Sequence, residues 1–337
     1  MLERPFTLRE RWRVQVGSGY SGISVLGTTA VTMGASEGFD QVVALDIANG
    51  ALRWRRRLGP AFPGKEGAVD GPTSTPTLAD DTAYVLSPRG EFTALALADG
   101  AVRWSVSLTE RHHAPRPHFG FTTAPLVTGE LVIVAAGAGE DAAFLAFARA
   151  DGALRWSAGT DTVHYQSPIL ARMGGEELLV GASHSFLFGL GPATGRVRWR
   201  LPHAGRDFEQ ETVQPLALQE DELLLKTQSL SSRRVRVEAE GEGARLETLW
   251  SSRYLSQNYT ALCWEGLLFG HTGDFLSCLD AESGELLWRS RPPGNGWVIR
   301  VDSWLVILTK AGSLHFAPAL AEGYEEHASL QLFEREP

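Results

Sequence analysis

An eleven-residue block recurs along this sequence, and its internal spacing constrains the fold more than any other feature. Each of five copies has a glycine at its seventh position and a tryptophan at its eleventh. The copies read ALDIANGALRW from residue 44, ALALADGAVRW from 94, AFARADGALRW from 146, GLGPATGRVRW from 189 and CLDAESGELLW from 278. Self-similarity at a period of this kind is typical of propellers and solenoids, in which each copy builds one unit of a larger stack.

Each block predicts a β-hairpin, because an alternating strand leads into a turn at the glycine and a second alternating strand follows. The apolar residue two positions before each tryptophan, such as Leu52 before Trp54, is expected to share its face and to pack beside it. A degenerate copy ends at Trp250, and an unpaired Trp12 opens the series. The structural positions of the repeat are thus Gly50, Gly100, Gly152, Gly195, Gly284, Trp12, Trp54, Trp104, Trp156, Trp199, Trp250 and Trp288.

The anchors from Trp12 to Phe333, which ends a further degenerate copy, lie about 40 to 50 residues apart, as in four-stranded propeller blades. We therefore expect residues 1–337 to form one all-β domain, a seven-bladed β-propeller of four-stranded antiparallel blades, with eight blades as the alternative. Closing the ring removes exposed sheet edges. An N-terminal strand around Trp12 is expected to close it beside Ser313–Ala319, and the last blade would hold five strands if residues 327–333 also form one.

The repeat resembles the PQQ-type repeat of quinoprotein alcohol dehydrogenases, of the BamB-type outer-membrane assembly factors and of other PQQ-like (WD40-like) propellers. This resemblance covers nearly the whole chain and implies the architecture, but members of the family share a fold without sharing a chemistry. In the dehydrogenases it implies PQQ held between a tryptophan floor and a ring of two adjacent cysteines, with Ca²⁺ bound by Glu, Asn and Asp. Here Cys263 and Cys278 are expected on different strands of one blade, about 10 Å apart, which exceeds disulfide reach.

Composition narrows the classes of partner. A formal net charge of −9 argues against nucleic acid, whose recognition needs clustered Lys and Arg. The arginines before the tryptophans are expected to be solvated or paired with acids, and they are Arg53, Arg103, Arg155 and Arg198. No apolar run reaches the roughly 18 residues of a membrane span, so we expect a soluble monomer with no transmembrane segment. Residues 1–13 lack the apolar stretch of a secretory signal, which predicts a cytoplasmic chain, or a periplasmic one if a signal was removed.

No motif predicts catalysis. The sequence has no Ser-His-Asp order, no HExxH and no glycine-rich phosphate loop. HHAPRPH, from residue 112, supplies three imidazoles, but its prolines leave no regular spacing that would aim them at one metal ion. We therefore expect no catalytic residue, no metal site and no cofactor, since the residues support neither PQQ nor Ca²⁺.

Histidines gather on one face of the predicted ring. In a propeller, the connections from outer to inner strand and those between the two middle strands emerge on the same face. Seven histidines are expected in or beside these connections: His112, His113, His118, His164, His184, His203 and His271. Loops on a rigid scaffold commonly carry binding residues. With the side chains expected at the starts of the inner strands, they predict a ligand-binding rim of Tyr20, Asp70, His118, Phe119, His164, Tyr165, Glu211, Tyr259 and Arg300.

These observations favour a non-catalytic binding scaffold that recognises a protein segment or a small polar ligand on its histidine-rich face. The alternative is a PQQ-dependent quinoprotein oxidoreductase with an atypical site.

Overall fold

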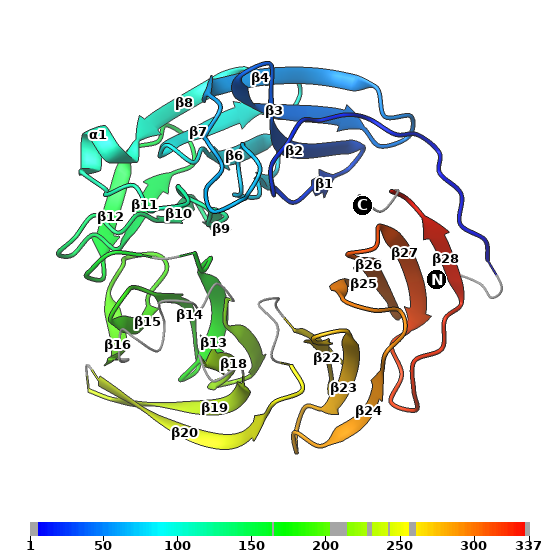
Figure 1. The fold of residues 1–337 in the computed structure, drawn as a ribbon. Coiled ribbons are helices and arrows are strands. Elements are labelled where there is room, and N and C mark those ends of the chain that lie inside the picture. The colour runs from blue at the N-terminus through cyan, green and yellow to red at the C-terminus, as the bar shows by residue number, and fades with distance from the viewer. Residues whose placement is uncertain are drawn as a thin grey trace.

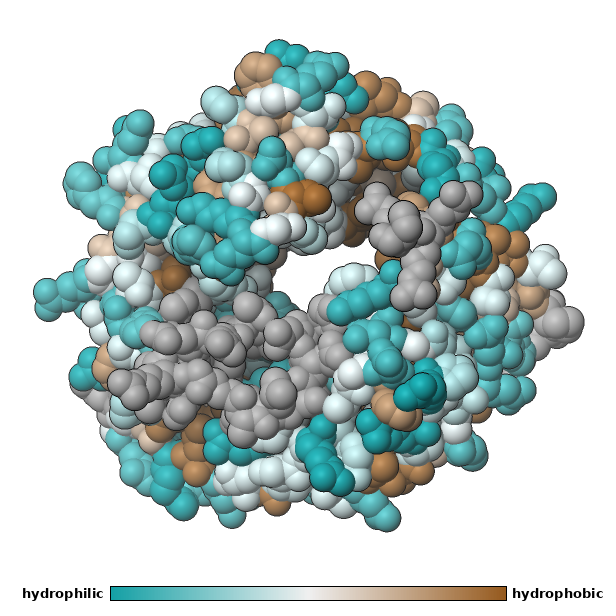
Figure 2. Space-filling view, in the orientation of Figure 1, coloured by the Kyte–Doolittle hydropathy of each residue, from teal (hydrophilic) through white to brown (hydrophobic). Residues whose placement is uncertain are grey.

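The computed structural model of this chain describes residues 6–163, 165–202, 214–227, 231–241, 243–255 and 261–333. Its strands form seven four-stranded antiparallel blades that follow one another around a ring (Figure 1). Figure 2 shows an open channel through the centre of this ring. The all-β, seven-bladed propeller is therefore confirmed, and the described strands leave no eighth blade.

We letter the strands of each blade A to D from the channel outward. Strands A to D of the first three blades are β1 (Ser24–Leu26), β2 (Thr29–Ser36), β3 (Phe39–Asp46) and β4 (Leu52–Pro60); β5 (Thr77–Ala79), β6 (Thr82–Leu86), β7 (Glu91–Ala96) and β8 (Val102–Ser107); and β9 (Leu126–Thr128), β10 (Leu131–Ala135), β11 (Phe144–Ala148) and β12 (Leu154–Ala158). A short helix, α1 (Leu108–His112), follows β8. No helix in the described part of the chain is long and apolar enough to cross a membrane.

The remaining blades continue in the same order. Their strands are β13 (Ile169–Met173), β14 (Glu176–Ala182), β15 (Phe186–Leu190) and β16 (Val197–Pro202); β17 (Leu216–Gln219), β18 (Glu222–Thr227), β19 (Ser231–Glu240) and β20 (Gly243–Ser252); β21 (Leu262–Trp264), β22 (Leu267–Thr272), β23 (Phe275–Asp280) and β24 (Leu286–Ser290); and β25 (Gly296–Val301), β26 (Trp304–Thr309), β27 (Ser313–Pro318) and β28 (Ala328–Gln331). The fourth and fifth blades join through one parallel pairing, Arg200 opposite Gly243. The C–D hairpin of the fifth blade is the long one, with ten residues in each strand.

The repeat glycine makes the C–D turn, because its φ lies between 70° and 73° in all five regular copies. A β-bulge follows the turn, so Trp54 lies opposite Ala44 while Leu52 lies opposite Leu45. Equivalent register shifts occur in the other regular hairpins. The bulge turns Leu52, Val102 and Leu154 outward, and these side chains are 52%, 41% and 43% exposed. The expectation that they pack beside the tryptophans is therefore wrong.

Most repeat tryptophans contact a carbonyl of the next blade. Trp54 donates its indole N–H to the carbonyl of Leu97, at 2.8 Å, and a Cβ added at Gly100 would lie 2.6 Å from its ring. The carbonyl and the glycine belong to the next C–D turn, three residues apart. Trp104, Trp156 and Trp250 repeat this arrangement. Clusters of buried side chains fill the six interfaces from the first blade to the seventh.

The N-terminal segment closes the ring, but not as a strand. The fourth strand of the last blade is β28, which pairs with β27, and residues 6–17 form no strand. Trp12 nevertheless lies on Gly50 and donates to the carbonyl of Ile47 at 3.0 Å. Phe6 packs on Trp304 of the last blade, with ring centroids 4.9 Å apart. Trp12 therefore supplies the contact expected of the last blade's outer strand, whereas Phe333 is 53% exposed and anchors nothing in the next blade.

Candidate functional site

Loops at the channel mouth bring part of the predicted rim together. These loops lead from strand D of one blade to strand A of the next, on the face that we call the D–A face. The Val69 N–H donates to the Tyr20 hydroxyl at 3.3 Å, and the neighbouring Glu66 pairs with His118 at 3.3 Å. The His118 and Phe119 rings lie 4.8 Å apart between centroids. These contacts begin at the first blade and join two D–A loops.

The fourth blade extends this set through Tyr165. Its hydroxyl accepts a hydrogen bond from the Phe119 N–H at 3.4 Å, and the two rings are 5.7 Å apart in an edge-on arrangement. Tyr20 is 59% exposed, Val69 is 50% exposed, and the His118 side chain is 54% exposed. We call Tyr20, Val69, His118, Phe119 and Tyr165 the aromatic rim. It presents apolar ring surface beside polar groups, a combination that suits protein recognition.

Hydrogen bonds stabilise the D–A loop between β4 and β5, which carries Val69. The carboxylate of Asp70 accepts the Gly64 N–H at 2.7 Å, so this predicted ligand-binding residue shapes its own loop. Asp40, buried under the loop, accepts the Phe62 N–H at 3.1 Å, and burial raises the pKa of this carboxyl group. Arg89 caps the loop by donating to the carbonyl of Ala61 at 3.2 Å.

Other predicted residues lie elsewhere. Arg300 was expected at the start of its inner strand, but β25 starts at Gly296 and Arg300 is near its other end. There its guanidinium stacks 3.8 Å from the Trp264 ring and donates to the carbonyl of Asp302. It therefore lies at the opposite end of the channel from the aromatic rim. His164, Glu211 and Tyr259 lie outside the described residues, as does His203.

His271 lies beside a B–C connection, as expected, but it does not face the solvent there. It is near the end of β22 and is only 3% exposed. Burial lowers its pKa to about 4, against the opposing effect of a hydrogen bond to the Gly294 backbone. This imidazole is a neutral interior group at neutral pH and does not belong to the binding face.

The cysteines do not fit the quinoprotein pattern. Cys263 lies on β21 and Cys278 on β23, as predicted, with β22 between them, and both are free thiols. Burial raises the pKa of the Cys278 thiol to about 12. Two residues so far apart in the chain cannot form the adjacent-cysteine ring of the dehydrogenases. The repeat tryptophans Trp104 and Trp156 are already committed to neighbouring blades.

The arginines before the tryptophans behave as expected. Arg53 pairs with Asp46 at 2.6 Å, Arg103 with Asp81 at 2.5 Å and Arg198 with Glu176 at 2.6 Å. These pairs lie on the outer surface of the blades and form no basic stripe.

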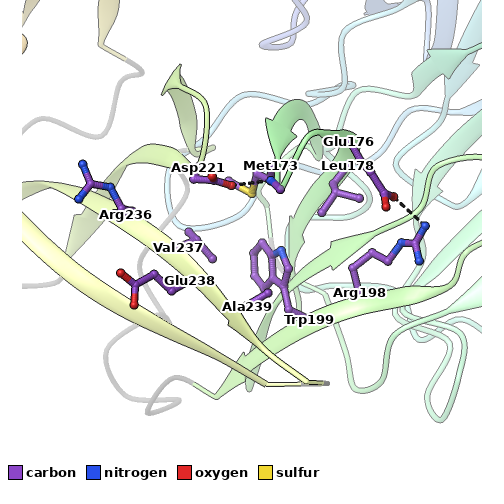
Figure 3. A pocket seen from close by; sticks show the side chains of 11 residues that line it. Met173, Glu176, Leu178, Arg198, Trp199, Asp221, Arg236, Val237, Glu238 and Ala239 are labelled. Carbon is purple, nitrogen blue, oxygen red and sulfur yellow. Dashed lines mark hydrogen bonds and ion pairs between the residues drawn. The ribbon is translucent and has the colours of Figure 1, made fainter.

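Sequence reasoning missed a cleft between the fourth and fifth blades (Figure 3). Its lining residues come largely from A–B and C–D turns, which place it on the face opposite the aromatic rim. Its volume is about 450 Å³, within the usual range of ligand pockets. It is lined by Met173, Gly174, Glu176, Leu178, Arg198, Trp199, Asp221, Arg236, Val237, Glu238 and Ala239. We call this the blade 4/5 cleft.

Trp199, beside the cleft, packs with Val235 and Val237 of the fifth blade but is placed differently from the other repeat tryptophans. It lies against Gly189 of its own blade, where an added Cβ would be 2.2 Å from the indole. Residues at the equivalent position opposite other tryptophans are Ala44, Ala94, Ala146, Arg234 and Cys278. The long β19–β20 hairpin forms the far wall. Two sequence signals could have revealed the cleft: the glycine that opens the fourth copy, and the degenerate copy that follows it.

Similar proteins support the fold. A family model described as outer membrane protein assembly factor BamB matches residues 40–227, more than half of the chain. No curated protein matches the sequence.

Solved structures with the same fold include BamB from Moraxella catarrhalis, 18% identical, with a TM-score of 0.56 over 86% of this chain and 80% of that one. The quinohemoprotein alcohol dehydrogenase from Comamonas testosteroni is 12% identical, with a TM-score of 0.64 over 95% of this chain and 68% of that one. The computationally designed Ika8 protein is 12% identical, with a TM-score of 0.62 over 95% and 89%. At these identities the likeness concerns architecture alone.

Proposed function

Because this chain belongs to the BamB family of PQQ-like repeat propellers, we propose that it is a non-catalytic scaffold that binds a protein segment at its aromatic rim. The observation that carries this proposal is the set of contacts that joins three loops: Val69 with Tyr20, Glu66 of the same loop with His118, and Phe119 with Tyr165. These contacts hold loops from successive blades in one arrangement before any partner arrives. Preorganisation of this kind lowers the entropic cost of binding.

The chemistry of the rim fits a peptide better than a substrate. Phe119 and Tyr165 offer rigid ring surface, which is favoured at interfaces because little side-chain entropy is lost. Glu66 and His118 add a polar pair that can orient the segment through hydrogen bonds. An enzyme of the quinoprotein type is the alternative, but the separate positions of Cys263 and Cys278 give it no support.

The family description also bears on location. An outer membrane protein assembly factor works outside the cytoplasm, so we propose a periplasmic location in place of the cytoplasmic one expected from residues 1–13. A fusion to alkaline phosphatase, expressed from the native locus, tests this because the enzyme needs the oxidising periplasm for its disulfides. An inactive fusion of full length would contradict the proposal.

The rim is tested with a double variant, Phe119→Ala with Tyr165→Ala. Partners are captured from native cells by cross-linking and quantified by mass spectrometry, with Leu287→Ala as the matched control because Leu287 is exposed on β24. We expect the control to recover the same partner as the unaltered protein and the double variant to recover at least about tenfold less, the usual effect of losing interface anchors. Equal recovery by all three proteins would refute the rim as the binding surface.

A further inference from the structure

The blade 4/5 cleft lies on the other face of the ring and is independent of the aromatic rim. Its interior has an apolar floor, formed by Met173, Leu178, Trp199 and Val237, which are largely buried in the interface core. Charged residues surround this interior, and Figure 3 shows Asp221 and the Glu176–Arg198 pair around Trp199. An apolar interior with a few charged groups is the usual composition of a small-ligand site.

Most charges at the cleft already have counterions. Glu176 pairs with Arg198 at 2.6 Å, and Glu238 pairs with Arg245. Arg236 is held by Glu222 at 2.9 Å and by Glu247 at 3.2 Å. Asp221 alone among the charged lining residues forms no ion pair with a described residue. The cleft therefore has one uncompensated negative charge.

Asp221 is rigidly held between the two blades. Its N–H donates to the carbonyl of Arg172 at 3.0 Å, and its carbonyl accepts the Val237 N–H at 2.8 Å. Its carboxylate Oδ1 accepts the Gly174 N–H at 2.6 Å. One carboxylate oxygen, Oδ2, is thus left for a ligand. A single oxygen suits the point charge of an ammonium better than the two-pronged guanidinium.

We infer that the blade 4/5 cleft binds a primary ammonium group on an apolar stem, with the ammonium at Asp221 and the stem against Leu178, Trp199 and Val237. A lysine side chain of a partner protein and a free alkyl diamine share this chemistry. The inference does not depend on the proposed function of the aromatic rim.

The experiment is a titration of the full-length protein followed by NMR, with the Gly174 amide as the reporter. The probes are N-acetyl-lysine methylamide, its arginine and norleucine counterparts, and 1,5-diaminopentane. We expect the lysine derivative to saturate the shift and to bind at least about tenfold more tightly than the neutral norleucine derivative. Tighter binding of the lysine derivative than of the diamine assigns the site to a protein side chain, and the reverse order assigns it to a free amine.

Two variants separate charge from structure. Asp221→Asn keeps an oxygen for the Gly174 N–H and removes only the charge, so we expect at least about tenfold weaker lysine binding. The matched control is Asp302→Asn, at the equivalent turn of the seventh blade and also at positive φ, where we expect less than about a twofold change. Gly189→Ala would push the indole into the cleft and abolish binding.

The inference is overturned if the norleucine derivative binds as tightly as lysine, if Asp221→Asn binds unchanged, or if no probe binds below about 10 mM, beyond which affinity is not specific. A Gly189→Ala protein that fails to fold does not affect this outcome, because Asp221→Asn decides it alone.

Discussion

The two sides of the fifth blade are joined to their neighbours in opposite ways. Toward the sixth blade, Trp250 lies on Gly284 and donates to the carbonyl of Ala281 at 3.1 Å. Arg234, only 2% exposed, bonds to the same carbonyl at 2.7 Å. Toward the fourth blade, Trp199 lies against Gly189 of its own blade and packs with Val235 and Val237 in the interface core, and the blade 4/5 cleft lies beside it. Both interfaces therefore have a buried core, but the two indoles pack against different backbones.

The difference between the two interfaces depends on which glycine the indole packs against. A turn glycine in the next blade lets Trp250 approach that backbone closely, because no Cβ stands in the way. Gly189 offers Trp199 the same freedom within its own sheet. Glycine position therefore decides which backbone the indole packs against.

The largest effect is expected for Arg234→Met, at the interface between the fifth and sixth blades. The substitution removes the hydrogen bond from Nε to buried Glu222, 2.6 Å long, and both backbone bonds to the sixth blade. We expect the free energy of unfolding to fall by about 4 kcal/mol, since breaking a buried ion pair leaves a buried charge. Chemical denaturation measures the loss. Arg236→Met, which removes a half-exposed arginine from the same carboxylate, should cost about 1 kcal/mol, and equal losses would refute the distinction.

The next effect concerns the turn glycines. A Cβ at Gly284 would lie 2.5 Å from the Trp250 ring at a φ of 73°, whereas Gly241, at 64°, has no atom within 4 Å of that position. We expect Gly284→Ala to cost about 3 kcal/mol, from left-handed strain and overpacking together. Gly241→Ala carries only the strain, about 1 kcal/mol. Melting curves that shift equally for both variants would show that the indole contact does not matter.

Acid should lower the stability of the protein through His271 in the sixth blade. Its folded pKa of about 4 lies below the unfolded value of about 6.5, so the unfolded chain binds the proton first. Stability is therefore full above pH 6.5 and falls as the pH drops toward 4. Between pH 7.5 and pH 5 we expect a loss of about 2 kcal/mol. His271→Leu should lose correspondingly less over the same range, and identical pH profiles would exclude this role.

The smallest expected change in stability comes from removing the indole hydrogen bond of Trp250. Trp250→Phe removes the bond to Ala281, whereas Trp199 makes no such bond to a described residue. We expect Trp250→Phe to cost about 1 kcal/mol more than Trp199→Phe, the usual net value of one hydrogen bond. Denaturant titrations of the two variants provide the comparison, and a greater loss in Trp199→Phe would reverse it.

The candidate sites were less predictable than the fold. Tyr20, Phe119 and Tyr165 could be placed at the channel mouth because they precede inner strands in the repeat. Arg300 could not, because β25 begins at Gly296 and is longer than the other inner strands, which leaves Arg300 near its far end. The blade 4/5 cleft lay in the most degenerate part of the pattern, where counting from glycine to tryptophan gives no guidance.

The sequence alone determined the C–D hairpins and their antiparallel order, because turns and strand alternation are local properties of the chain, and it favoured seven blades over the alternative of eight. Only the tertiary structure decided where each indole lies, that Trp12 closes the ring without a strand, and that Leu52 faces outward. The physical reason is that these outcomes depend on contacts between residues far apart in sequence, such as Trp12 with Gly50, and on a bulge visible only in the pairing of two strands.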